Sequence, residues 1–182
     1  MWHTSLFLVI LSSLCLLTLS HVIASQIAPV TQDNDPRLLH QANLLDEDTT
    51  AIRGRITIWS GLNDVGVRVH VLFWAYHIHE RPVPDDGNCY GTGAHLDLYK
   101  RENKPSCDMN APQTCEIGEL SGKHGPVYAP GEQAFEVLYP DYFLSNVPDT
   151  AAYYGNLSLV VHTPDNERVN CGNFQVAPLC QE

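Results

Sequence analysis

The sequence predicts an all-β fold, a sandwich or barrel of short strands joined by long loops. Apolar residues alternate with polar residues at period two from residue 52 onward, whereas no stretch keeps a 3.6-residue period over three turns. Segments rich in Gly, Pro, Asp and Asn, notably 82–93 and 103–113, separate the alternating runs. The 182 residues are enough for one domain with a hydrophobic core.

The first 24 residues have the features of a secretory signal peptide. Residues 6–19 are almost entirely apolar, and Val22, Ile23 and Ala24 form a cleavage site of small residues. No Lys or Arg precedes the apolar run, so a signal anchor is the alternative, although the run is short for a membrane span. We therefore expect a secreted, extracellular protein, with association to the cell surface left open.

Three further segments follow the signal peptide 1–24 in the expected domain organisation. Residues 25–50 are acidic with few apolar anchors, which predicts a loosely ordered lead-in with a short helical turn near 38–45. The β domain is expected at 51–178 and a short C-terminal tail at 179–182.

The alternating runs give the expected strands in order. Isoleucines at 52, 56 and 58 and valines at 65, 67, 69 and 71 fall on alternate positions. Later strands are expected at 133–138, 157–162 and 169–176. The valine-rich run leads almost directly to Tyr76, so a shortened connection is expected to distort the strand that begins there.

The charge excludes two classes of partner. Asp and Glu outnumber Lys and Arg by 21 to 10, a formal net charge of −11, and none of these residues lies in the first 24. Nucleic acids and anionic membranes need a basic surface, so we expect no nucleic-acid partner and no membrane partner after signal removal. A small anionic substrate would need a local positive site on this acidic protein.

Cysteine usage and a glycosylation motif fit export. Five cysteines remain after the signal peptide, an odd number. Cys107 and Cys115 are close enough in sequence to close their own loop, and Cys180 is left over. The sequon that begins at Asn156 predicts a glycoprotein if the chain enters the secretory pathway.

Four of the nine histidines are placed as a metal site requires. His77 and His79 leave the same face of a predicted strand, about 7 Å apart along it. His162 ends another apolar strand, and His95 lies in a glycine-containing loop. Imidazole nitrogens suit copper, zinc, iron or nickel, so the ligand type does not select the metal. A single His-x-His pair is more often a surface feature, and its surroundings decide between the two interpretations.

Those surroundings contain five motifs in a fixed order: Tyr76-His77-Ile78-His79, Gly87-Asn88-Cys89, Gly93-Ala94-His95, Val160-Val161-His162 and Arg168-Val169-Asn170-Cys171-Gly172. In type, order and rough spacing they resemble the copper/zinc superoxide dismutase family. Residues 114–125 resemble in particular its copper-only branch, which fungi and oomycetes secrete. The resemblance covers about residues 52–176 and implies the Greek-key, immunoglobulin-like β-sandwich or barrel of that family.

The resemblance implies a copper site. His77, His79 and His162 match copper ligands, and His95 matches the imidazole that bridges copper and zinc in the two-metal enzymes. From residue 96 to residue 119 there is no histidine, so the nitrogen ligands of a tetrahedral zinc site are missing. One copper ion per chain is therefore expected and zinc is not. His124 lies beyond that gap, and we expect it to have a structural role.

The resemblance also implies the residues around the metal. Arg168 matches the guanidinium beside copper that receives superoxide, and Cys89 and Cys171 match the disulfide between the sheets. Glu116 is expected to orient His95 and to support it in catalysis, with Glu119 as the second choice. Only residues 163–167 separate His162 from the arginine, where the two-metal enzymes have a long loop, so an open, shallow site is expected.

These features predict an extracellular copper-only superoxide dismutase that converts superoxide to oxygen and hydrogen peroxide by Cu(II)/Cu(I) cycling. Arg168 and His95 are its expected catalytic residues, with superoxide as the substrate. We expect a monomer, with the cell wall or a copper donor as further partners. Two alternatives remain, namely a non-catalytic copper-binding or buffering protein on the same scaffold and a structural, adhesion-type sandwich. An arginine beside the metal favours the enzyme, because a carrier does not need to guide an anion.

Overall fold

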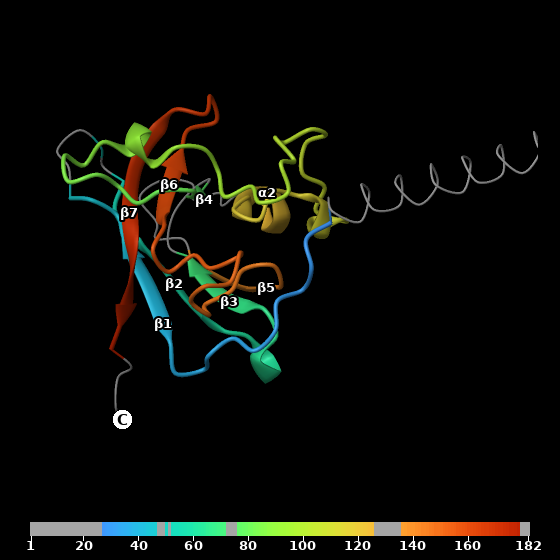
Figure 1. Cartoon of the computed structure of the whole chain (residues 1–182). Helices are drawn as coiled ribbons and strands as arrows, with labels where there is room; N and C mark the ends of the chain where they lie inside the picture. The colour runs from blue at the N-terminus through green and yellow to red at the C-terminus, as the bar shows by residue number, and fades with distance from the viewer. Residues whose placement is uncertain (1–26, 47–49, 51, 72–75, 126–135, 179–182) are drawn as a thin grey trace, which may run out of the picture.

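The computed structural model describes residues 27–46, 50, 52–71, 76–125 and 136–178. Within them, seven antiparallel strands form one strongly curled sheet in the order β4-β6-β7-β1-β2-β3-β5 (Figure 1). The strands are β1 Leu39–Asn43, β2 Arg55–Ser60, β3 Val67–Val71, β4 Tyr76–His79, β5 Val137–Asp141, β6 Ser158–His162 and β7 Arg168–Ala177. The predicted all-β fold class is confirmed.

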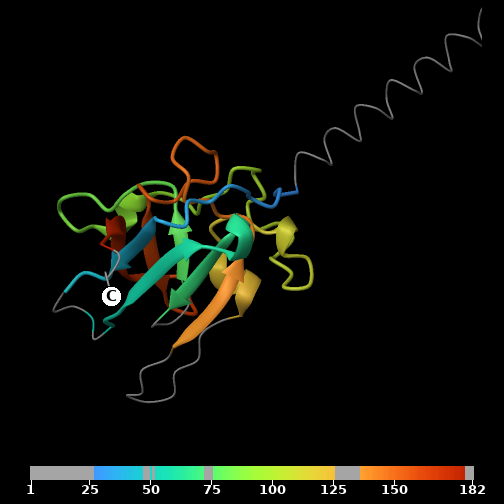
Figure 2. The same cartoon turned by 90° about the horizontal axis from the view of Figure 1, so that it is seen from below.

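Strand β7 joins the two halves of the sheet. Its first residues, Arg168 to Asn173, pair with β6, and its last residues, Phe174 to Ala177, pair with β1. Beyond β1, strands β2, β3 and β5 lie side by side, as Figure 2 shows from below. Because β7 belongs to both halves, the sheet curls around a single core.

Period-two alternation forms that core. In β2 and β3 the isoleucines and valines point inward and are fully buried, whereas the residues between them remain partly exposed. Ile58 lies opposite Val69 and Ile56 opposite Val71, so β-branched side chains face each other across the strands. The apolar residues whose alternation predicted these two strands are therefore the residues that the strands bury in the core.

The lead-in expected at 25–50 contains a strand, so the helical turn predicted near 38–45 is wrong. β1 pairs with β2 on one side and with β7 on the other, which places it inside the sheet. Its inward positions hold His40 and Ala42, both fully buried, instead of large apolar residues. The apolar alternation that marks the other strands is consequently missing from the sequence of β1.

Helices are few and short in the described residues. They are η1 Leu62–Asp64, η2 Cys89–Thr92, η3 Pro112–Thr114 and α2 Leu120–His124. None of the described helices has the length and hydropathy that crossing a bilayer would require. The predicted signal peptide, the tail and Cys180 lie outside the described residues.

Two disulfides form between the cysteine pairs expected from the sequence. Cys89–Cys171 connects η2 to β7 across 82 residues, and Cys107–Cys115 closes a loop of 8 residues. Residues 72–75, which contain the shortened connection, lie outside the described residues. β4 itself pairs with β6 in unbroken register from Tyr76 to His79, so the expected distortion is absent from this strand.

Candidate metal centre

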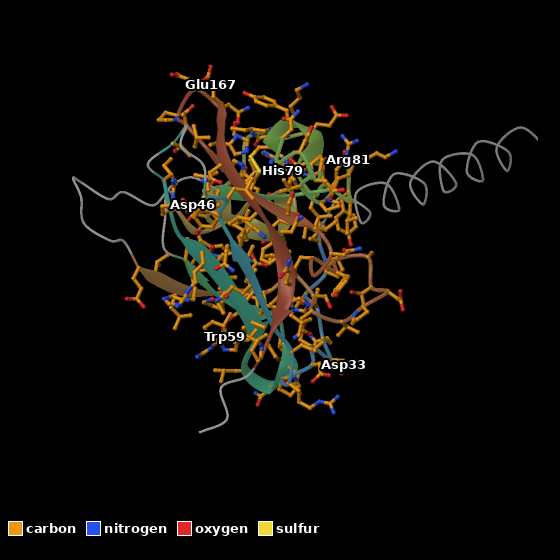
Figure 3. The ribbon with its side chains drawn as sticks, turned by 90° about the vertical axis from the view of Figure 1, so that its left-hand side faces the viewer. Asp33, Asp46, Trp59, His79, Arg81 and Glu167 are labelled. Atoms are coloured by element: carbon orange, nitrogen blue, oxygen red, sulfur yellow. A yellow bond between two sulfur atoms is a disulfide. The ribbon has the colours of Figure 1, made fainter. Side chains whose placement is uncertain are left out.

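Four histidine rings converge at one end of the curled sheet. His77 and His79 come from β4, His162 ends β6, and His95 follows η2, and one ring nitrogen of each lies within 4.8 Å of the others. Strand pairing brings them together, because β4 pairs with β6 and His79 forms a backbone bridge with His95. His79 lies at this end of the molecule in Figure 3.

Hydrogen bonds fix which nitrogen of each ring faces the cluster. Nδ1 of His79 donates to the carbonyl oxygen of Gly93 at 3.0 Å, and Nδ1 of His95 donates to Oε2 of Glu116 at 2.6 Å. In both rings Nε2 therefore carries a lone pair. Nε2 of His79 lies 3.2 Å from Nε2 of His162, whose Nδ1 is 3.4 Å from the carbonyl oxygen of Asn166.

His77 has the opposite orientation. Its Nε2 lies 2.9 Å from Oε1 of Glu119 and 3.0 Å from Oγ of Ser121, so Nε2–H is the donor. Its Nδ1 is buried and has no hydrogen-bond partner among the described residues. A buried polar atom without a partner costs about 1–3 kcal/mol, which a bound cation would remove. This orphaned nitrogen, together with the three lone pairs beside it, fits one metal ion.

Two of the rings, those of His79 and His162, are held neutral, as metal ligands must be. Burial, followed by the charge of His95, lowers the pKa of His79 to about 2. Burial, followed by the charge of His77, lowers the pKa of His162 to about 4. Both imidazoles therefore keep their lone pairs at neutral pH.

Two carboxylates lie behind the histidine rings, and each carboxylate pairs with a different histidine. Glu116 is at hydrogen-bond distance from His95, whereas the nearer oxygen of Glu119 is 4.0 Å from Nδ1 of His95. Glu119 pairs instead with His77 and also accepts from the backbone N–H of Gly122 at 2.7 Å, where α2 begins. Burial alone would raise the pKa of Glu119, but the hydrogen bond and charge of His77 and the Gly122 N–H lower it to about 2.

Arg168 lies against the backbone that supports His79. Its Nη1 donates to the carbonyl oxygen of Cys89 at 2.8 Å and to Oγ1 of Thr92 at 3.0 Å, and its Nη2 donates to the carbonyl oxygen of Gly93 at 2.5 Å. Gly93 thus accepts from the arginine and from His79. These contacts leave Nε–H and one Nη2–H of the guanidinium without a partner among the described residues.

Solvent reaches this cluster chiefly at one ring. His77, His79 and His162 are buried, whereas the His95 side chain is 20% exposed. The link at 163–167 forms a tight turn in which the N–H of Thr163 donates to the carbonyl oxygen of Glu167 at 2.9 Å. The side chain of His95 is more exposed than that of His77, at 20% against 11%, and the openness expected from the short link stays a prediction.

The structure adds residues that sequence reasoning did not select. Ser121 contacts Nε2 of His77, and Thr92 lies 3.1 Å from Nδ1 of His79. Ser121 lies in the 114–125 segment that the sequence analysis singled out, whereas nothing in the sequence distinguished Thr92. His124 is occupied elsewhere, because its Nε2 lies 2.8 Å from Oδ2 of Asp141 and its ring stacks on Tyr139.

Comparison with curated proteins finds superoxide dismutases of fungal cell surfaces. The chain is 33% identical over 184 residues to the cell surface Cu-only superoxide dismutase of Arthroderma benhamiae, covering 82% of this chain and 49% of that protein. It is 41% identical over 101 residues to the cell surface superoxide dismutase [Cu-Zn] 4 of Candida albicans, covering 56% of this chain and 40% of that protein. The chain thus spans about half the length of the curated relatives that it matches. No family description matches the chain.

Solved structures give the same result. Candida albicans superoxide dismutase 5 in its Cu(II) form superposes with a TM-score of 0.69 at 26% identity, covering 80% of this chain and 96% of that one. A mutant of the same protein gives a TM-score of 0.66 at the same identity, with 81% and 97% covered. The curled sheet and the polypeptide path around the four histidines are therefore those of a known fold.

Proposed function

We propose that this chain is an extracellular copper-only superoxide dismutase, because it is similar to fungal cell-surface copper-only superoxide dismutases over about half of their length. The observation that supports the proposal most strongly is the convergence of four imidazoles, with the unpartnered Nδ1 of His77 among them. Its reaction would convert two superoxide anions and two protons to oxygen and hydrogen peroxide.

We infer that His77, His79, His95 and His162 hold the copper ion. His77 would bind through Nδ1, because Nε2 is used by Glu119 and Ser121, and His79 and His95 would bind through Nε2. Four neutral nitrogen donors suit copper. When bound, copper supplies the one-electron Cu(II)/Cu(I) couple that dismutation needs and that zinc lacks.

Zinc has no comparable donor set in the described residues. The second group that could hold a cation consists of His95, Glu116 and Glu119, which offers one nitrogen, and that residue already belongs to the first group. Both carboxylates accept from ring N–H groups, which is the usual arrangement behind a metal-bound imidazole. We therefore propose one copper ion per chain and no zinc.

The chain's own residues would handle the anion and the protons. The two unpartnered N–H groups of Arg168 form a planar donor pair for superoxide beside His79. His95 is the ring most open to solvent, and Glu116 holds the proton on its Nδ1. In the state of the site in which Nε2 of His95 is not bound to the metal, this nitrogen would take up a proton from solvent and pass it to the product anion. We propose catalytic roles for Arg168, His95 and Glu116 on this basis.

The cellular setting follows from the relatives. Curated homologues are named as cell-surface proteins, so we propose that this chain acts outside the cell, on or near the surface. We propose further that it acts as a monomer and receives copper from an external donor, with the cell wall as a possible neighbour.

Metal content and superoxide decay test the function together. Copper-loaded protein should contain one copper per chain and should accelerate superoxide decay measured by pulse radiolysis. His162→Ala should lose copper and activity, whereas His70→Ala should keep both, because His70 pairs with Glu136 outside the cluster. Copper binding without faster superoxide decay would instead favour a copper carrier. Absence of bound copper would favour a structural, adhesion-type sandwich.

A further inference from the structure

We propose, resting on the function proposed above, that Arg81 is a second cationic residue of the site and draws the anionic substrate toward Arg168. Arg81 follows the end of β4, two residues after His79, and both are labelled in Figure 3. Its guanidinium extends the positive region beyond the one arginine that the sequence motif identifies.

Arg81 and Arg168 meet at the same glycine. A Cβ atom built on Gly93 would lie closest to Oε1 of Glu80, 2.7 Å from Nε of Arg81 and 2.8 Å from Nη2 of Arg81, so the Arg81 guanidinium and the Glu80 carboxylate together cover the glycine's α-carbon. The carbonyl oxygen of the same glycine accepts from Nη2 of Arg168 and from Nδ1 of His79. The φ angle of Gly93 is 79°, a conformation that favours glycine. The two cations and a histidine of the cluster therefore surround one residue that has no side chain.

The backbone of Arg81 is fixed while its charge faces water. Its N–H donates to the carbonyl oxygen of Thr92 at 3.1 Å, and its own carbonyl oxygen accepts from Oγ of Ser158 at 2.7 Å. The side chain is 61% exposed, and its ion-pair partner is Glu80, 50% exposed, at 3.8 Å. An exposed pair at this distance is weak, so Glu80 leaves much of the positive charge available to an approaching anion.

Arg81 also acts electrostatically on Arg168. Burial lowers the pKa of Arg168, nearby Tyr90 raises it, and the charge of Arg81 lowers it further. This effect agrees with the shared contact at Gly93, because like charges interact appreciably only over short separations in water.

An acidic protein needs this second cation. The formal net charge is −11, and the charged residues between His162 and Arg168 are Asp165 and Glu167, both acidic. The short link therefore provides no positive charge to attract superoxide. Arg81, which lies against the same glycine as Arg168, provides one.

The expected effect follows from Coulomb's law in water. Removing one unit charge about 8 Å from the approaching anion should slow association about twofold, and reversing the charge should slow it about fivefold. Both differences should nearly disappear at about 0.5 M salt, where screening acts over a few ångströms. Arg81→Lys should retain most of the wild-type rate, because it keeps the charge.

The experiment compares Arg81→Gln, Arg81→Glu and Arg81→Lys with Arg37→Gln in copper-loaded protein. Arg37 provides the matched control, since it is 85% exposed and precedes β1, whose first residue pairs with the end of β7 remote from Arg168. Its variant changes the net charge by the same amount at a distance. The first readout is the second-order rate constant for superoxide decay. The second, which does not depend on activity, is the dissociation constant of azide, measured from its absorption change. Both are measured at about 10 mM to 500 mM salt, which varies the screening length.

Weaker azide binding and slower superoxide decay in the Gln and Glu variants at low salt, with little change in Arg37→Gln, would support the proposal. Equal effects of Arg81→Gln and Arg37→Gln would overturn it, since only net charge would then matter. If the wild-type protein did not accelerate superoxide decay, the proposed function would fail, and the azide measurement would still decide whether Arg81 attracts anions.

Discussion

Replacing Lys123 by Met should destabilise the protein more than removal of any exposed charge described above. Nζ of Lys123 lies 2.6 Å from Oδ2 of Asp141 and donates to the carbonyl oxygen of Ile117 at 2.8 Å. The two charged side chains are 1% and 0% exposed. Methionine keeps the apolar stem but leaves the carboxylate buried with His124 and two backbone N–H groups.

The magnitude follows from this burial. Removing one partner of a buried ion pair costs about 3–5 kcal/mol, because the remaining charge is uncompensated. For a domain of this size, each kcal/mol lowers Tm by about 2–4 °C, so a fall of about 10 °C is expected. Because α2 carries Ser121 and begins after Glu119, both in contact with His77, copper should also bind more weakly.

Thermal and urea unfolding of the metal-free protein measure the effect. The matched control is Arg37→Met, which removes an exposed ion pair with Asp35 at 2.8 Å. An exposed pair of this kind contributes little to the free energy of unfolding. Equal losses for the two variants would refute the reasoning, since burial would then not determine the cost of breaking an ion pair here.

Three further predictions concern pH, a disulfide and the proton at the site. Asp141 has a lowered pKa because the charge of Lys123 and the His124 hydrogen bond outweigh burial, so its contribution to the unfolding free energy should be constant above about pH 5 and be lost below about pH 4, where only the unfolded chain binds the proton. Urea titrations should show this loss in addition to the earlier fall below about pH 6.5 that the lowered pKa values of His79 and His162 cause. Replacing Cys89 and Cys171 by Ser removes a disulfide that spans 82 residues and should lower the free energy of unfolding by about 4.5 kcal/mol in the chain-entropy model. Denaturant unfolding measures this loss, and a loss below about 1 kcal/mol would contradict that model. Glu116→Gln should change the pH profile of superoxide decay while copper content stays the same, and an unchanged profile would show that its contact with His95 does not control proton supply.

Part of the fold could be predicted because two neighbouring strands bury β-branched residues at alternate positions. Strands β2 and β3 have this pattern, and their predicted positions differ from the observed ones by only a few residues. β1 was missed because its inward residues are His40 and Ala42, which resemble a polar loop in sequence. Its position depends on pairing with two distant strands, and a local pattern does not contain that information.

The sequence predicted which histidines form the site, but not all of the contacts that their rings make with neighbouring carboxylates. The spacing of His77 and His79 and the ordered motifs around them identified the residues that the structure brings together. The contact of Glu116 with His95 follows the expectation from the resemblance, whereas the contact of Glu119 with His77 was not predicted, because the two carboxylates lie on one turn and Glu119 was considered only for His95. The contribution of Arg81 was equally hidden, since it depends on the close approach of two backbone segments at Gly93.

Strand β4 is the edge strand at one end of the sheet, but the backbone groups on its outer side are not free to pair with a strand of another chain. The N–H of Ile78 donates to the carbonyl oxygen of Gly118, its carbonyl oxygen accepts from the N–H of Leu96, and the N–H of Glu80 donates to the carbonyl oxygen of Ala94. A strand with an open edge can recruit a second molecule and begin fibre growth. Here the loops that carry His95 and Glu119 occupy those hydrogen-bonding groups, so the segments that complete the metal centre also protect this border of the sheet from aggregation.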